Sequence, residues 1–157
     1  MQKLVMWVVE NFGVVEMQID SEESYMRNIT WNYVKELKDV LSIEKFENAH
    51  EFTYPADLKE ILFKYNGGRP NLRYYDVGSE YDKEFKNLLS FNETDIENIY
   101  KVYPIESSDG TLVPFASDPA GNFFVLKDSK IFLWNHESNS CIFISDTFSD
   151  FLMKLHD

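Results

Sequence analysis

The pattern of apolar residues between Tyr54 and Pro70 is that of a helix with one buried face. Four residues share the i, i+3, i+4, i+7 spacing that places them on one side: Leu58, Ile61, Leu62 and Tyr65. Pro55 suits a first helical turn, and Asp57 lies where the helix dipole favours negative charge. The run Asn66–Gly68 ends the helix because glycine accepts left-handed backbone, and Pro70 prevents continuation. These signals predict a scaffold helix without reaction chemistry.

The last third of the chain has the pattern of short strands followed by a helix. Its apolar runs are separated by turn sequences, among them Ser117–Gly121 and Asp128-Ser129. Pro114 is expected to start the first strand or to place it at a sheet edge, because proline donates no ladder hydrogen bond. Asp146 or Thr147 caps the closing helix. The expected elements are strands 112–116, 122–127, 130–134 and 141–145, a polar loop 135–140, and a helix that buries Phe148, Phe151, Leu152 and Leu155.

The upstream part is predicted to be mainly helical. Residues 28–42 have an apolar stripe formed by Trp31, Val34, Leu37 and Leu41, with charged residues between them. Residues 3–11 fit either a helix or a strand, because their valines are β-branched. The remaining expected elements are a turn or helix start at 20–23, an extended piece at 51–53, a strand at 71–77 and helices at 82–89 and 92–100. Helices followed by consecutive strands and a helix indicate an α+β fold around a mainly antiparallel sheet.

Four short motifs occur in an order that resembles the SUKH superfamily of Smi/Knr-type domains. They read P-x-D-L-K-x-x-L-x-x-Y-N-G-G-x-P, P-F-A-x-D-x-x-G-N-x-F, W-x-H-E and S-F-x-x-F-L, where the last one closes the chain. The matching segments are Tyr54–Pro70, Pro114–Phe124, Trp134–Glu137 and Thr147–Leu152. The resemblance implies an antiparallel sheet flanked by helices. It also implies a role as a bacterial toxin-immunity protein or as a regulator of the kind found in fungal cell-wall synthesis.

Length and composition favour one folded domain over residues 1–157. The apolar fraction is 44% and no Pro-, Gly- or Ser-rich linker divides the chain, so one core can be filled. The longest apolar run, Leu4–Val9, is too short to span a bilayer and lacks a signal-peptide cleavage pattern. Cys141 is the only cysteine, which excludes an intramolecular disulfide and suits a reducing, cytoplasmic location.

The formal net charge of −12 narrows the class of partner. Nucleic acids and anionic membranes demand clustered lysine and arginine, so neither is expected to bind directly. A basic protein partner, or no charged partner, fits better. The acidic stretches Glu16–Glu23 and Glu80–Glu97 are candidate surfaces for such a partner, with solvated faces as the alternative.

Reactive chemistry has little support in the sequence. Cys141 lies in an apolar strand pattern, which favours a buried inert thiol. The histidines His50, His136 and His156 are scattered and lack the spacing of a helical zinc pair. A glycine-rich phosphate loop is also missing. We therefore expect no catalytic residue, cofactor or metal site.

The candidate binding residues lie around two turns of the last third. Asp118 and Asn122 are expected to hydrogen-bond their own turn, and the neighbouring polar loop contains His136 and Glu137. Trp134 is expected to be half-buried at a strand end, where it is the best single aromatic anchor for a partner.

Three functional hypotheses follow. The leading one, which rests on the resemblance, is a cytoplasmic immunity protein that binds a cognate toxin, such as a basic nuclease, and blocks it by occlusion. The second is a non-catalytic regulatory scaffold without a toxin partner. The third is an enzyme or small-ligand binder, which would require a deep pocket where acids and His136 converge.

Overall fold

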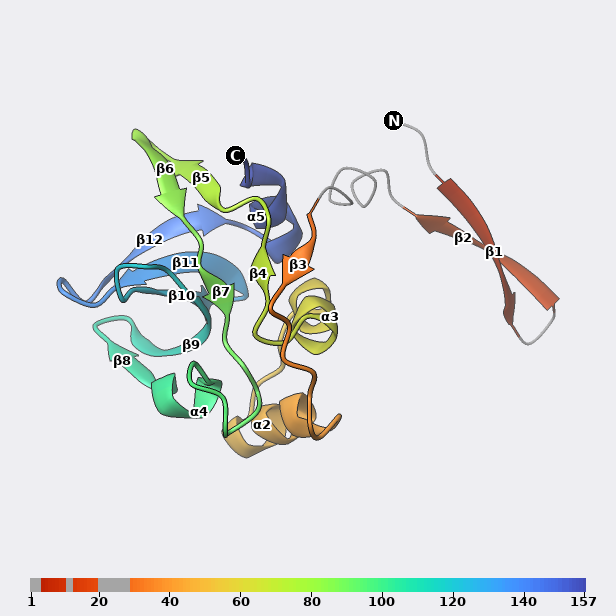
Figure 1. The fold of residues 1–157 in the computed structure, drawn as a ribbon, viewed down its shortest axis with the longest axis horizontal. Helices are drawn as coiled ribbons and strands as arrows, with labels where there is room; N and C mark the ends of the chain where they lie inside the picture. The colour runs from red at the N-terminus through yellow and green to blue at the C-terminus, as the bar shows by residue number, and fades with distance from the viewer. Residues whose placement is uncertain (1–3, 11–12, 20–28) are drawn as a thin grey trace. The chain divides into compact units, whose positions relative to one another are not determined.

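The computed structural model describes residues 4–10, 13–19 and 29–157, and the chain divides into two units at residues 30 and 31 (Figure 1). In the first unit, strands β1 (Leu4–Glu10) and β2 (Gly13–Ile19) form an antiparallel hairpin. Residues 4–10 are therefore a strand. The turn or helix start expected at 20–23 lies outside the described residues. The single domain expected over 1–157 stays a prediction.

The second unit is built on a 6-stranded antiparallel sheet in the order β12-β11-β10-β9-β7, with β8 also paired to β9. Its strands are β7 (Asn87–Leu88), β8 (Ile105–Ser107), β9 (Gly110–Ser117), β10 (Phe123–Lys127), β11 (Lys130–Asn135) and β12 (Ser140–Ser145). The strands predicted in the last third are confirmed within one residue at each end, except that β9 begins two residues earlier. Asp128 and Ser129 join β10 to β11 with φ values of 52° and 62°, as a tight hairpin turn requires.

Pro114 lies inside β9, so the prediction that it starts the strand or marks an edge was wrong. It is opposite Val125 of β10, next to a register shift. On its other side, β9 pairs with β8 through residues 110–112 and with β7 through residues 116–117. Because Pro114 falls between those two pairings, its missing N–H costs no ladder hydrogen bond.

The helices of the second unit are α2 (Ser42–His50), α3 (Ala56–Lys64), α4 (Ile99–Val102) and α5 (Phe148–Lys154). The predictions for α3 and α5 are confirmed: Leu58 and Leu62 are fully buried, and the Thr147 side chain accepts from the Asp150 N–H as the α5 cap. Two short antiparallel pairs complete the unit: β3 (Trp31–Asn32) with β4 (Arg69–Pro70), and β5 (Tyr74–Val77) with β6 (Glu80–Glu84). Among the described residues, no helix has the length and apolarity that a membrane span requires.

Aromatic rings form the centre of the core, on the side of the sheet that α5 covers (Figure 1). Phe124 of β10 is fully buried and lies within ring-contact distance of four others. Its partners are Tyr75 at 5.7 Å, Phe85 at 4.9 Å, Phe115 at 6.4 Å and Phe151 at 5.4 Å. The generous aromatic content of the chain is therefore used largely for packing.

The helix predicted over 28–42 is wrong over residues 29–41, because tertiary hydrogen bonds hold them as a short strand followed by irregular backbone until α2 begins. The buried Asn66 side chain donates to the Lys35 carbonyl at 2.7 Å. Asn92 bonds the same segment twice, since it accepts from the Lys38 N–H and donates to the Glu36 carbonyl, each at 2.9 Å. These bonds replace the intrahelical ones that the apolar spacing suggested.

The helix predicted over 82–89 is also wrong. Phe85, Leu88 and Leu89 are buried, but they belong to extended backbone around β6 and β7. The Leu88 N–H donates to Gly68, and the Leu89 N–H donates to Phe115, each at 2.9 Å. Burial on both sides of a strand produced an apolar spacing that resembled a helix face.

The other upstream predictions hold in part. The strand expected at 71–77 is shorter and starts at Tyr74. The helix expected at 92–100 is wrong over residues 92–98, which have irregular backbone. Helical structure begins only at Ile99 with the single turn α4, whose Asn98 cap accepts from the Lys101 N–H. The extended piece expected at 51–53 is irregular and begins with Glu51 in a left-handed conformation that ends α2.

Candidate docking surface

The sheet has a second face, opposite the aromatic core, which we call the aromatic sheet face. Side chains alternate along a strand, so the neighbours of the buried Phe124 and Leu133 point to this other face. Five half-exposed side chains from three adjacent strands define it: Phe123, Phe132, Trp134, Cys141 and Phe143. Beneath them and toward α4, a small buried cluster consists of Ile105, Leu112 and Val125.

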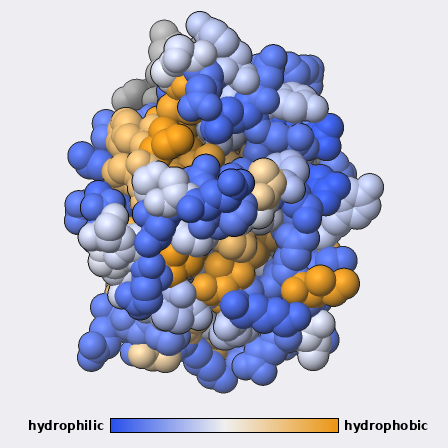
Figure 2. Space-filling view, turned by 90° about the vertical axis from the view of Figure 1, so that its left-hand side faces the viewer, coloured by the Kyte–Doolittle hydropathy of each residue, from blue (hydrophilic) through white to orange (hydrophobic). Residues whose placement is uncertain are grey.

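Paired positions bring the rings of the aromatic sheet face together. Phe123 is opposite Trp134, with their rings stacked at 6.4 Å, and Trp134 is opposite Cys141. Phe132 is opposite Phe143, with their rings edge-to-face at 5.5 Å. Phe143 keeps 46% of its surface exposed. Figure 2, which views the side where β8 and β12 lie, shows apolar surface bordered by hydrophilic residues. Rigid aromatic surface of this kind is typical of interface hot spots.

The border of the aromatic sheet face has an excess of negative charge. Its two lysines are each paired: Lys127 with Asp109 at 3.4 Å and Lys130 with Asp146 at 3.7 Å. Three further exposed carboxylates have no ion pair within the described part of the chain: Glu106, Asp128 and Glu137. The unbalanced charge beside the rings is therefore acidic, which favours a partner with basic residues around an apolar centre.

Three of the predicted binding residues meet at one end of this face. The turn prediction is correct: Asp118 accepts from the N–H groups of Ala120 and Asn122 at 2.9 and 2.7 Å. The buried Asn122 amide donates to Asp118 and accepts from His136 Nδ1 at 2.7 Å, which assigns the proton to Nδ1. Gly121 has φ +88°, a backbone conformation that other residues rarely adopt, and the His136 ring lies beside it.

The other two predicted residues are close by but play different parts. Trp134 is half-buried, as expected, and its Nε1–H donates to Asn139 at 2.7 Å. This bond fixes the indole, so its exposed edge is preorganised for contact. Glu137 is exposed, and its backbone N–H bonds Asn135 while its carboxylate faces solvent. The hydrogen bonds among Asp118, Asn122 and His136 order the two turns. These polar atoms therefore have a structural role, both when the group is considered for catalysis and when it is considered for binding.

Cys141 lies on the aromatic sheet face and is half-buried rather than fully buried. Burial raises the pKa of its thiol, and the nearby Asp109 acts in the same direction. A thiol with a raised pKa is a poor nucleophile, which agrees with the inert role expected from its strand context.

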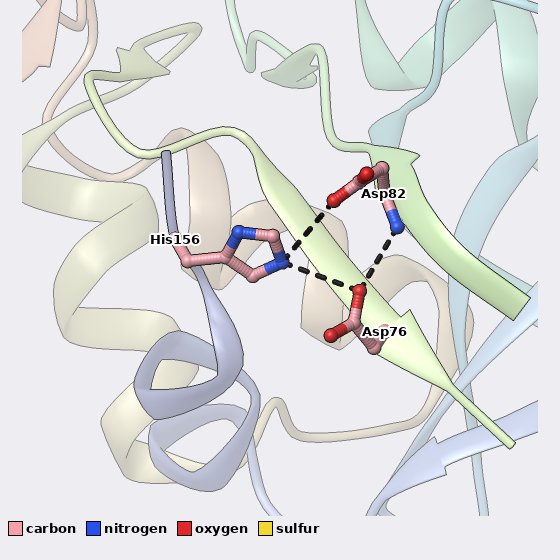
Figure 3. A group of neighbouring side chains, drawn as sticks. All are labelled: Asp76, Asp82 and His156. Atoms are coloured by element: carbon pink, nitrogen blue, oxygen red, sulfur yellow. Dashed lines mark hydrogen bonds and ion pairs between the residues drawn. The ribbon is translucent and has the colours of Figure 1, made fainter.

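A separate polar group joins the end of the chain to β5 and β6. His156 Nε2 is 3.3 Å from Asp76 and 3.8 Å from Asp82, while the Asp82 N–H donates to Asp76 at 2.9 Å (Figure 3). The backbone of His156 also pairs with Tyr74. The three side-chain ligand atoms lie within 4.8 Å of one another, so they could hold a small cation. Nδ1 contacts the Asp157 carbonyl, so the ring faces the two carboxylates with Nε2. A proton on Nε2 already balances the negative charge of those carboxylates.

This group makes stability depend on pH. The backbone contact with Asp157 and the bond to Asp76 raise the pKa of His156, while the Asp82 N–H and His156 lower the pKa of Asp76. The His156 contribution is therefore present below about pH 6.5 and is lost as pH rises through its raised pKa. The Asp76 contribution is present above about pH 4 and is lost as pH falls through its lowered pKa. Both contributions to stability are present between about pH 4 and pH 6.5.

We expect Asp76→Asn to lower the pKa of His156, because it removes the charge that stabilises the imidazolium. Proton NMR titration of the His156 ring measures this directly. Asp82→Asn is the control, and its effect should be smaller because Asp82 lies farther from Nε2. Equal His156 titration curves for the wild type and Asp76→Asn would contradict this account.

Among the described residues, the hollows that border Asp118, α2 and the β3–β4 pair are not lined by His136. A hollow near the predicted residues holds about 270 Å³ and borders Asp118, Gly121 and Phe123. A larger hollow of about 600 Å³ lies elsewhere, against α2. The shape around the predicted site suits contact with a protein surface better than enclosure of a small ligand.

Comparison with known proteins identifies the family. The model of the SMI1/KNR4 family (SUKH-1) matches residues 40–154, which is most of the chain and runs from just before α2 to the end of α5. The chain belongs to the SMI1/KNR4 family. Domains of this family are commonly immunity proteins and are generally non-enzymatic. No curated protein and no solved structure matches the chain significantly. The match includes every residue of the aromatic sheet face.

Sequence reasoning missed most residues of this SUKH-1 sheet face. Trp134 was singled out, but its ring partner Phe123 and the Phe132–Phe143 pair were not. The available signal was the continuous apolar run in each of the segments 123–127, 130–135 and 140–145, which makes both faces of each strand apolar. When helices cover only one side of a sheet, a strand that is apolar on both faces leaves apolar side chains exposed on the uncovered side.

Proposed function

We propose that this SUKH-1 protein is a cytoplasmic immunity protein that binds a cognate toxin domain and blocks it by occlusion. Family membership carries the proposal, since SUKH-1 domains commonly have this role. The charge supports it: many toxins of this kind attack nucleic acid and are basic, so an inhibitor with net charge −12 gains electrostatic steering.

The aromatic sheet face is the proposed contact surface. Phe143 and Trp134 provide preorganised rings, and the exposed carboxylates Glu106, Asp128 and Glu137 provide the acidic border. The lysines and arginines of a basic toxin active site would contact the carboxylates of that border. The carboxylates would take the positions that the phosphates of the toxin's substrate otherwise occupy. Blocking by occlusion requires no reaction from the immunity protein, in keeping with the inert Cys141 and with polar networks that order turns.

Purified protein mixed with the toxin domain encoded beside its gene tests the proposal. We expect a one-to-one complex with a dissociation constant in the nanomolar range or below at low salt, as in other tight inhibitor complexes. Affinity should fall as salt rises from about 50 to 300 mM, because charge contacts at an exposed border are screened. No complex at low salt, or no adjacent toxin gene, would count against an immunity role and favour the regulatory alternative.

A further inference from the structure

A second surface feature is a groove of about 460 Å³, which we call the Arg69 groove. It lies where the extended segment before α2 passes the β3–β4 pair and the loop that precedes α4. The lining residues that matter here are Tyr33, Lys35, Arg69, Asp95, Ile96 and Glu97. None of them belongs to the aromatic sheet face.

The acids of the Arg69 groove are already engaged by neighbouring groups. One Asp95 oxygen accepts from the Ser90 hydroxyl and from the Asn92 amide. Glu97 pairs with Lys86 at 2.7 Å and accepts from Ser117 at 3.2 Å, and these contacts lower the pKa of its carboxyl despite partial burial. Both carboxylates of the groove are therefore held by neighbouring groups: Glu97 by an ion pair, and Asp95 through one of its two oxygens.

The two cations that line the groove, Lys35 and Arg69, have no ion pair with any described residue. The Arg69 guanidinium lies over the Tyr33 ring at 5.5 Å, which fixes its plane. Its Nε is buried without a hydrogen-bond partner in the described part of the chain. Buried donors of this kind normally have an acceptor, and beside a guanidinium without an ion pair an anionic acceptor is electrostatically favoured.

Arg73 shows the same arrangement with its anion present. Its guanidinium lies over the Tyr74 ring at 5.6 Å and also pairs with Glu84 at 3.5 Å. The comparison suggests that the Arg69–Tyr33 stack lacks only a carboxylate. That carboxylate would come from outside the described residues, although the chain as a whole has net charge −12.

The apolar side of the groove is unusually exposed. Tyr33 is 72% exposed and has φ +58°, an uncommon backbone conformation for a bulky side chain. Strained residues of this kind cluster at ligand clamps. Ile96, on the opposite loop, is 86% exposed. An apolar side chain of a partner could cover both.

We propose that the Arg69 groove binds an aspartate or glutamate side chain of a protein partner, with an adjacent apolar side chain packed on Tyr33 and Ile96. The acid completes the arrangement seen at Arg73 by pairing with the free guanidinium edge. This inference goes beyond the proposed function, because it concerns a different surface and the opposite charge. It holds whether or not the partner is a toxin.

NMR titration of the full, ¹⁵N-labelled protein with terminally blocked peptides tests the inference. The probes are Leu-Glu-Leu-Glu-Leu and Leu-Lys-Leu-Lys-Leu. We expect saturable shifts of the Arg69 Nε–H and of the Tyr33 amide with the acidic peptide alone. No shift at millimolar acidic peptide, or equal shifts with the lysine peptide, would overturn the proposal. Acetate or phosphate binding as tightly as the peptide would also overturn it, because it would show a small-anion site only.

Matched variants locate the effect. Arg69→Gln should weaken acidic-peptide binding about tenfold or more, whereas Arg73→Gln should leave it unchanged. Arg69→Lys keeps the charge but removes the planar fork, so it should also lose most of the binding while preserving the fold. Unchanged peptide affinity in Arg69→Gln or Arg69→Lys, with a native amide spectrum, would contradict the proposal.

Discussion

Phe124→Ala should destabilise the protein by about 3–5 kcal/mol, the usual cost of removing a fully buried phenylalanine. Phe124 is completely shielded from solvent and lies at the junction of β10 with the rings of Phe85, Phe115 and Phe151. Its removal leaves a cavity that these rings cannot fill without leaving their own packing. Urea denaturation followed by circular dichroism measures the change in the free energy of unfolding.

Phe123→Ala is the matched control for this prediction. Phe123 is the neighbouring residue of the same strand, but its ring lies on the half-exposed aromatic sheet face. Its loss should cost about 1–2 kcal/mol, because solvent already reaches part of the ring. Similar costs for the two variants would show that the core does not lie on the Phe124 side of the sheet.

Phe143→Glu should weaken binding of the cognate toxin about 100-fold or more. The substitution replaces a ring at the proposed contact with a carboxylate that must be desolvated beside Phe132 and Trp134. Although the partner is expected to be basic, a charge within the apolar centre has no geometry prepared for pairing. Isothermal titration calorimetry with purified toxin measures the affinity.

Phe63→Glu is the control for Phe143→Glu. Phe63 of α3 is 50% exposed, close to the 46% of Phe143, but it lies outside the aromatic sheet face. We expect its toxin affinity to match that of the wild type. If both variants bind equally well, the contact surface lies elsewhere on the molecule.

Local sequence signals were sufficient to predict the elements whose backbone hydrogen bonds join residues close together in the chain. The α3 and α5 segments have periodic apolar faces, Pro55 precedes α3, and Thr147 caps α5. The β10–β11 hairpin has a two-residue turn, so all three elements were predicted close to their observed bounds. The segment 28–42 has equally good helical spacing, yet residues 29–41 form a short strand and irregular backbone. Its backbone partners are the side chains of Asn66 and Asn92, and no local pattern reveals bonds to residues so far along the chain.

The candidate site was predictable only at one end. Asp118 and Asn122 belong to a turn that can be read from its sequence, whereas the contact of Asn122 with His136 depends on the pairing of β10 with β11. The Arg69–Tyr33 stack depends similarly on the β3–β4 pairing, which brings together residues 36 positions apart. Contacts across paired strands follow from register, which a single sequence does not specify.

The most direct test of the account is titration of the cognate toxin's activity with the purified protein. We predict a linear loss of activity that reaches completion at one equivalent, with Phe63→Glu inhibiting like the wild type and Phe143→Glu failing to inhibit. Full toxin activity in the presence of excess wild-type protein at low salt would contradict the central claim.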